Sequence, residues 1–137
     1  MSDISPSLRA AVVHRAGNRC EYCRLSQLGQ EATFHIDHVA PRASGGPTTI
    51  DNLALACVSC SLRKWAKEMA TDPDSGEELP LFNPRTHVWA EHFRWDGVRV
   101  GALTPTGRVT VATLALNRPL IVAIRQEETA RGRHPPV

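Results

Sequence analysis

Two cysteine pairs, Cys20-Glu21-Tyr22-Cys23 and Cys57-Val58-Ser59-Cys60, enclose the stretch that decides the fold. Each Cys-x-x-Cys pair presents two thiolates from one tight turn, and four thiolates complete a tetrahedral Zn²⁺ site. A complete set leaves no coordination position for water, so such a site is structural. The spacing therefore predicts a structural zinc with Cys20, Cys23, Cys57 and Cys60 as ligands. Four buried free thiols are the alternative interpretation.

The composition agrees with a small chain that benefits from a metal crosslink. Of the 137 residues, 42% are apolar and only 5% are aromatic, which predicts a modest aliphatic core. No apolar run approaches the roughly 20 residues of a membrane span, and the N-terminus lacks a secretory signal pattern. We therefore expect a cytoplasmic protein with no membrane partner. Thiols stay reduced in the cytosol, which favours zinc over disulfides.

The elements around the cysteines predict an α+β fold with a ββα core. Ser5-Pro6 has the pattern of a helix N-cap followed by proline at the first helical position. We expect a helix over 7–16 with Leu8, Ala11 and Val12 buried. A strand over 34–37 should follow, with Ile36 on one side and His35 and Asp37 on the other, and then a loop over 40–47 and a helical turn that ends at Asn52. The core should end with a strand over 53–56 and a helix over 58–69, in which Leu62, Trp65, Ala66 and Met69 have helical spacing.

Residues 80–137 differ in composition from the segment that the cysteines enclose. We expect, in order, a helical turn at 88–92, a hairpin through Asp96-Gly97, a turn at 104–107, a segment over 108–116 that fits strand or helix equally well, a helix over 118–128 and a frayed tail over 130–137. The predicted organisation is a zinc-stapled core over 1–70 and a C-terminal α+β extension over 71–137 packed on it.

Asp37 and His38 lie inside the loop that the zinc would close. A carboxylate can hold a hard cation such as Mg²⁺, and a neutral imidazole beside it can take a proton from water. The cation would stabilise charge that develops on a scissile phosphate. The pair therefore suits metal-assisted phosphodiester hydrolysis. A surface Asp and His without a catalytic role is the alternative.

The cysteine pairs, together with Phe34-His35-Ile36-Asp37-His38, Gly45-Gly46, Asp51-Asn52-Leu53 and Arg63-Lys64, resemble the HNH endonuclease family in residue type, order and spacing. The resemblance covers about a third of the chain. It implies a ββα-metal fold that hydrolyses DNA by nicking or cleavage. By this resemblance His38 is the general base, Asp37 is a ligand of the catalytic divalent ion, and Asn52 shapes the loop and helps to orient the base. The C-terminal half also resembles the tail of one bacterial HNH subgroup, for which it implies no chemistry.

One position departs from the family pattern. Members have Asn or His directly after the last cysteine as a second ligand of the catalytic ion, and this chain has Ser61 there. A serine hydroxyl is a weaker ligand that can still bind through a water, because Mg²⁺ keeps several waters. Some members have a further His where this chain has Trp65, and His35 is a candidate to compensate. The departure leaves open a catalytically impaired HNH-fold module that only binds nucleic acid, and a zinc-stapled domain whose 81–137 portion docks a protein.

Four basic residues lie near the predicted cleft: Arg42, Arg63, Lys64 and Lys67. As a group beside a phosphodiesterase-like site, they are expected to contact the phosphates of nucleic acid, most simply DNA. The net charge of +2 permits such a partner without demonstrating it. All other basic residues besides His are arginines, which suit bidentate phosphate recognition, although a GC-rich genome gives the same composition.

Overall fold

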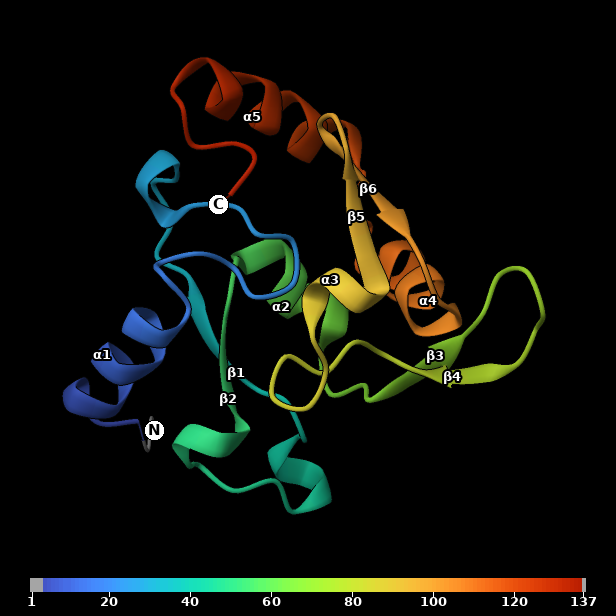
Figure 1. Ribbon diagram of the computed structural model, residues 1–137. Coiled ribbons are helices and arrows are strands. Elements are labelled where there is room, and N and C mark those ends of the chain that lie inside the picture. The colour runs from blue at the N-terminus through green and yellow to red at the C-terminus, as the bar shows by residue number, and fades with distance from the viewer. Residues whose placement is uncertain (1–3, 137) are drawn as a thin grey trace. The chain divides into compact units, whose positions relative to one another are not determined.

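The structure is a computed structural model that describes residues 4–136, and it divides into two compact units (Figure 1). Unit 1 comprises the described residues up to Glu68 together with Asn83–Thr86. Unit 2 comprises Met69–Phe82 and the described residues from His87 onward. In this part of the chain, no helix combines the length and the apolar character that crossing a membrane requires.

The centre of unit 1 is a ββα arrangement, which confirms the predicted fold class (Figure 1). Strands β1 (His35–His38) and β2 (Leu53–Ala56) are antiparallel, with Asp37 opposite Ala54. All four residues of β2 are buried, as expected of a continuous apolar run in a core strand. Helix α2 (Val58–Lys64) follows directly and contacts both strands.

Burial differs from residue to residue along β1, which forms within one residue of the predicted strand. Asp37 is buried, whereas Ile36 is only half-buried and His35 is exposed. The carboxylate of Asp37 is tolerated inside because it has polar partners there, described below.

Helix α1 (Pro6–Arg15) begins as predicted, with the Ser5 Oγ accepting a hydrogen bond from the Leu8 N–H at 3.1 Å. The predicted apolar stripe is wrong except at Val12, because Leu8 is half-buried and Ala11 is exposed. Arginine side chains fix the helix instead. Arg9 donates to the Phe34 carbonyl at 2.7 Å, and Arg15 donates to the Ile50 carbonyl at 2.6 Å.

Three short 3₁₀ helices lie in the loops of unit 1: Gln27–Gly29, Arg42–Ser44 and Ile50–Asn52. The last is the predicted turn before β2. The loop over 40–47 folds back on itself, with the Gly46 N–H donating to the Pro41 carbonyl at 2.9 Å. A Cβ atom at Gly46 would lie 1.8 Å from the Ala40 carbonyl oxygen, so only glycine fits there.

Helix α2 is shorter than predicted. The expected helix over 58–69 ends at Lys64, because Trp65 adopts a positive φ of 52°. Met69 belongs instead to a strand, β3 (Met69–Thr71). The predicted apolar stripe is not buried either, since Leu62 and Trp65 expose 60% and 73% of their surface.

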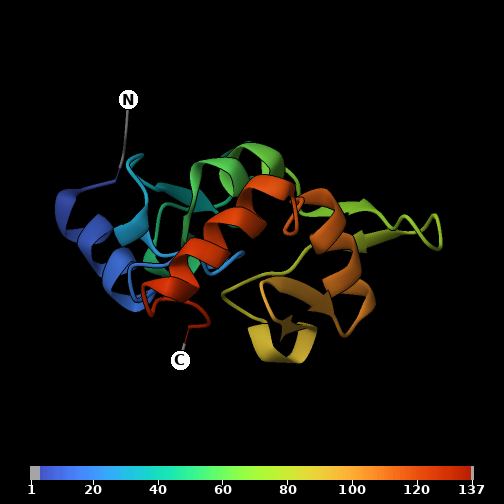
Figure 2. The ribbon, with the colours of Figure 1, turned by 90° about the horizontal axis from the view of Figure 1, so that it is seen from above.

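The described residues of unit 2 form two hairpins and three helices. Strand β3 pairs with β4 (Glu78–Pro80), and the predicted Asp96-Gly97 hairpin pairs β5 (Phe93–Asp96) with β6 (Arg99–Ala102), with Gly97 at φ 61°. The helices are α3 (Trp89–His92), α4 (Pro105–Thr113) and α5 (Pro119–Ala130). The hairpin of β3 and β4 contacts α4, and the turned view shows it beside that helix (Figure 2).

Two predictions for unit 2 are wrong. Residues 104–107 do not form a separate turn: the Thr104 Oγ1 accepts from the Gly107 N–H at 3.0 Å and caps α4, which settles residues 108–116 as largely helical. The tail is also not frayed over its described length. Arg133 forms an ion pair with Glu128, and the His134 ring packs edge-on against Trp95 with ring centroids 4.6 Å apart.

Candidate active site and metal centre

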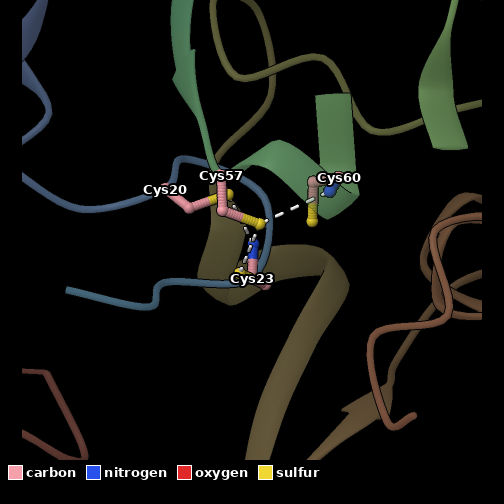
Figure 3. Close-up of side chains that lie close together, drawn as sticks. All are labelled: Cys20, Cys23, Cys57 and Cys60. Atoms are coloured by element: carbon pink, nitrogen blue, oxygen red, sulfur yellow. Dashed lines mark hydrogen bonds between the residues drawn. The ribbon is translucent and has the colours of Figure 1, made fainter. Parts of the chain in front are cut away.

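The four cysteines converge in the core of unit 1 (Figure 3). Their sulfur atoms all lie within 4.8 Å of one another, and all four residues are buried and free of disulfides. Cys20 and Cys23 come from the turn after α1, and Cys57 and Cys60 from the start of α2. The Cys57 Sγ also caps α2 by accepting from the Cys60 N–H at 3.4 Å. In the described chain this is the group of His, Cys, Asp and Glu side chains arranged to hold a metal ion.

The electrostatics of the cluster favour a cation. Burial raises the pKa of the Cys20 thiol, so this side chain resists ionisation in a protein without metal. The pKa of Cys57 lies far below its ordinary value, because the three neighbouring thiols donate toward its sulfur. A bound cation would stabilise further thiolates in the same space.

The two residues between Cys20 and Cys23 connect the cysteine cluster to the rest of unit 1. The Glu21 carboxylate accepts from the Leu55 N–H at 2.7 Å and forms an ion pair with Arg85. Its burial raises the pKa of Glu21 above the ordinary value. Tyr22 is fully buried and points its hydroxyl to Asp37.

Asp37 is contacted by one residue within the first cysteine pair and by one residue on the helix that follows the second. The Tyr22 hydroxyl donates to Asp37 Oδ2 at 2.7 Å, and the Lys64 Nζ lies 3.2 Å from the same oxygen. Tyr22 lies within the first Cys-x-x-Cys turn, and Lys64 lies one helical turn after Cys60. Both contacts fall on Oδ2, so Oδ1 has no hydrogen bond or ion pair to the described residues.

The carboxylate of Asp37 is nevertheless electrostatically costly. Asp37 is 8% exposed, and this burial raises its pKa above the ordinary value. The attraction of Lys64 and the hydrogen bond from Tyr22 oppose the shift and offset only part of it. A further positive charge near Oδ1 would therefore stabilise the ionised form.

Asn52 fixes the loop that faces His38. Its Oδ1 accepts from the Ala40 N–H at 2.9 Å, and its Nδ2 donates to the carbonyls of Ala40 and Pro47 at 3.0 and 2.9 Å. The bonds join the two ends of the loop over 40–47. Thr48 follows directly, and its hydroxyl lies 2.9 Å from His38 Nε2.

A cavity of about 430 Å³ brings most of the predicted catalytic residues together. His35, Asp37 and His38 from β1 line it, together with Ser61 from α2 and Arg42 from the loop. Ser61 is hydrogen-bonded rather than isolated, because its Oγ lies 3.0 Å from His35 Nδ1. Asn52 does not line this cavity.

The predicted phosphate contacts divide into two groups. Arg42, Arg63 and Lys67 are exposed. Lys64 is 2% exposed, and its ammonium group lies 3.1 Å from the Val39 carbonyl and next to Asp37. The prediction that Lys64 contacts nucleic acid is therefore wrong, because it lies on the face of α2 that packs inward.

Sequence reasoning missed Tyr22 and Thr48 as parts of the site. Tyr22 lies between two cysteines of the motif, where any residue type is compatible with it, and Thr48 lies outside the motif residues. A hydroxyl at each position was the signal available, and only the tertiary fold shows which side chain it reaches.

In a comparison with protein families, residues 20–67 match the family described as HNH endonuclease. The matched segment contains both cysteine pairs, β1, β2 and α2. The resemblance predicted from the sequence is thereby confirmed over this segment. Comparison with curated proteins and with solved structures gave no significant match.

Proposed function

We propose, from the premise that residues 20–67 form an HNH endonuclease domain, that the protein is a metal-dependent endonuclease that hydrolyses phosphodiester bonds of DNA. The observation that carries the proposal is the shared cavity. Asp37 and His38, adjacent on β1, line it together with the exposed Arg42. A carboxylate, an imidazole and a guanidinium at one cavity are the groups that phosphodiester hydrolysis needs.

His38 is the proposed general base. It takes a proton from the water that attacks phosphorus, while the bond from phosphorus to the leaving oxygen breaks. The Thr48 hydroxyl at 2.9 Å from Nε2 fixes the plane of the ring, and Asn52 fixes the loop that precedes Thr48. Asn52 is therefore a positioning residue that acts through the loop.

Two metal sites belong to the proposal, and the residues present fit both. Cys20, Cys23, Cys57 and Cys60 would hold a structural Zn²⁺. The 3.7 Å between the sulfur atoms of Cys23 and Cys57 suits thiolates that each lie about 2.3 Å from one tetrahedral ion.

For the catalytic site, Asp37 through Oδ1 would hold a divalent cation such as Mg²⁺, with Ser61 assisting directly or through water. A single carboxylate suffices because Mg²⁺ keeps several waters and binds substrate phosphates. When bound, such a cation stabilises the charge that develops on the phosphate oxygens.

Arg42, Arg63 and Lys67 are the proposed phosphate contacts. All three are exposed, and Arg42 lines the cavity itself. Such contacts position the backbone of DNA without reading its sequence. The described residues of one chain present one such site, so a single chain is expected to nick one strand.

A second candidate function is an HNH-fold module that binds nucleic acid without cleaving it. Two contacts favour it: the Lys64 ammonium lies 3.2 Å from Asp37, and the Ser61 hydroxyl is hydrogen-bonded to His35. Both proposed ion ligands thus have partners within the protein, which weakens their hold on a cation.

The deciding experiment is nicking of supercoiled plasmid by the purified protein in Mg²⁺, Mn²⁺ or EDTA. We expect cleavage with a divalent ion, loss of cleavage in EDTA, and loss of cleavage in His38→Ala. His14→Ala is the matched control, because His14 is exposed on α1 and does not line the cavity. Equal cleavage by wild type and His38→Ala would reject the assignment.

The Ser61→Asn variant separates the two candidates. An amide at this position is a stronger ligand than a hydroxyl, so cleavage that rises from near zero in this variant supports the impaired module. If the wild type cleaves and the cleavage rate of Ser61→Asn lies within a few-fold of the wild-type rate, the result supports the enzyme.

A further inference from the structure

The cavity that contains Asp37 and His38 has an apolar wall that the proposed hydrolysis does not use. Trp65 and Leu62 form part of this wall, and they lie three residues apart at the end of α2. They are 73% and 60% exposed. A single exposed apolar residue is ordinary on a protein surface, but an exposed tryptophan and leucine at the proposed active site form a surface that a ligand can cover.

Packing within the protein does not explain the position of Trp65. Its indole ring makes no ring contact and no side-chain hydrogen bond to the described residues. Its backbone, at φ 52° and ψ −129°, lies in a region that residues with a side chain rarely adopt. Such strain is most often found at functional sites. Here it ends α2 and leaves a large ring exposed at the cavity.

The charge around the ring selects the class of ligand. Arg42 lines the same cavity, and Arg63 is exposed on α2 next to Leu62. An aromatic ring and a guanidinium group that line one cavity are a combination that binds single-stranded nucleic acid, where bases stack on rings and phosphates meet cations. An apolar protein partner would gain nothing from the guanidinium group of Arg42.

We infer that Trp65, supported by Leu62, is a subsite for one unpaired nucleobase next to the scissile phosphate. The inference rests on the proposed nuclease function. In a duplex, each base face is covered by its neighbours, so the indole can stack only on a base that is unpaired or displaced from the helix. The substrate class is therefore DNA with single-stranded character at the cut site, such as a flap, a mismatch or a displaced strand.

The test measures binding without cleavage, so that it is independent of catalysis. Fluorescently labelled single-stranded oligonucleotides with one abasic site at each successive position are bound to the His38→Ala protein. We expect one position at which the abasic site weakens binding by about 5- to 150-fold, the range of one base–aromatic stack. Trp65→Ala on the same background should weaken binding to the intact oligonucleotide equally, and Trp65→Phe should restore most of it.

The two losses must also be shared. In the Trp65→Ala protein, the abasic site at that position should cost no further affinity, because the ring it would have stacked on is gone. The inference would be overturned if the abasic site weakened binding equally at every position, or if the losses of affinity caused by the abasic site and by Trp65→Ala were fully additive. Leu28→Ala is the matched control, because Leu28 is 74% exposed and does not line the cavity; it should leave binding unchanged.

Trp65→Gly separates the ring from the fold. Glycine adopts positive φ without strain, so this variant should melt at or above the temperature of Trp65→Ala while losing the same affinity. If affinity follows the melting temperature instead, the role is structural and the inference fails. Plasmid nicking reports separately on the proposed function. If the abasic site and Trp65→Ala cause the same non-additive loss of affinity but the wild type does not nick plasmid, the base subsite stands and the nuclease is rejected. If the wild type nicks plasmid but the abasic site weakens binding equally at every position, the nuclease stands and the subsite is rejected.

Discussion

Two side chains contact one oxygen atom, Oδ2 of Asp37: one lies in the first cysteine pair and the other on the helix that begins at the second. Tyr22 donates to it from the first turn, and Lys64 forms an ion pair with it from the helix that the second turn begins. The cysteine cluster, which is the proposed zinc site, and the proposed active site are therefore linked through two side chains. Anything that moves either turn displaces the carboxylate.

The Lys64→Met variant tests the buried ion pair. Lys64 is 2% exposed and Asp37 is 8% exposed, so removal of the ammonium leaves a buried carboxylate without its counter-charge. We expect the free energy of unfolding to fall by about 3–5 kcal/mol. Denaturation in urea measures it, with Lys67→Met as the exposed control expected to change stability by less than about 0.5 kcal/mol. Similar values for both variants would contradict the buried pair.

Tyr22→Phe removes one hydroxyl and keeps the ring. The lost hydrogen bond to the carboxylate of Asp37 should cost about 1.5–3 kcal/mol of stability, because the acceptor is charged and buried. If Asp37 positions the reaction, plasmid nicking should fall while metal analysis still finds the same metal content. A variant that loses its metal as well would show that Tyr22 serves the cysteine turn rather than Asp37.

At the scale of elements, the hairpin of β3 and β4 is joined to α4 by one carboxylate. Asp72, at the end of β3, accepts from Arg108 Nε at 2.9 Å and from its Nη2 at 2.6 Å, and Ser75 donates to the same group at 2.7 Å. These bonds hold the pKa of Asp72 well below its usual range, chiefly through the Arg108 guanidinium.

The shifted pKa gives a pH prediction for unit 2. The unfolded chain binds a proton on Asp72 more readily than the folded chain does, so the contribution to stability is complete above about pH 4 and is lost as the pH falls below it. Thermal unfolding followed by circular dichroism between pH 7 and pH 2 should show this loss, and Asp72→Asn should reduce it. Asp96→Asn, at an exposed hairpin position, should leave the pH profile unchanged.

Elements with local signals were predictable, and those that depend on distant contacts were not. The Ser5 cap, the apolar run of β2 and the Asp96-Gly97 turn act within a few residues, so the sequence pattern contains them. The end of α2 escaped prediction because Leu62 and Trp65 have helical spacing yet face solvent. Thr104-Pro105 has the pattern of a turn and also of a helix cap, and the fold uses it as a cap.

The candidate site divides in the same way. Asp37, His38 and the cysteines follow from the motif, because residue type and order alone define it. The burial of Lys64 and the contact of Tyr22 with Asp37 do not follow, since both join segments of unit 1 that are separated by at least 15 positions in sequence. Charge alone placed Lys64 with the phosphate contacts, and packing removed it from them.

For the whole molecule, the proposal predicts that bound zinc is the largest single contribution to the stability of the fold. Metal analysis should find about one zinc per chain, because the four thiols can form one tetrahedral site. Removal of the ion with a strong chelator, or Cys57→Ser, should unfold unit 1, since its strands depend on the two cysteine turns. A protein that stays folded without metal would refute the zinc assignment. The matched control is Ser59→Ala, within the same turn but with no thiol.

The ion pair of Glu21 with Arg85 has a consequence for how this domain is inherited and transplanted. Arg85 belongs to unit 1 but lies 18 residues beyond the end of the HNH match at residue 67. A gene fragment trimmed at that boundary would encode Glu21, between the first two cysteines, without the arginine that forms its ion pair. Unit 1 is thus formed by two segments that are separated in the sequence. Recombination that preserves this ion pair must carry the codons for 83–86 along, and a swap at the family boundary is expected to give a less stable product.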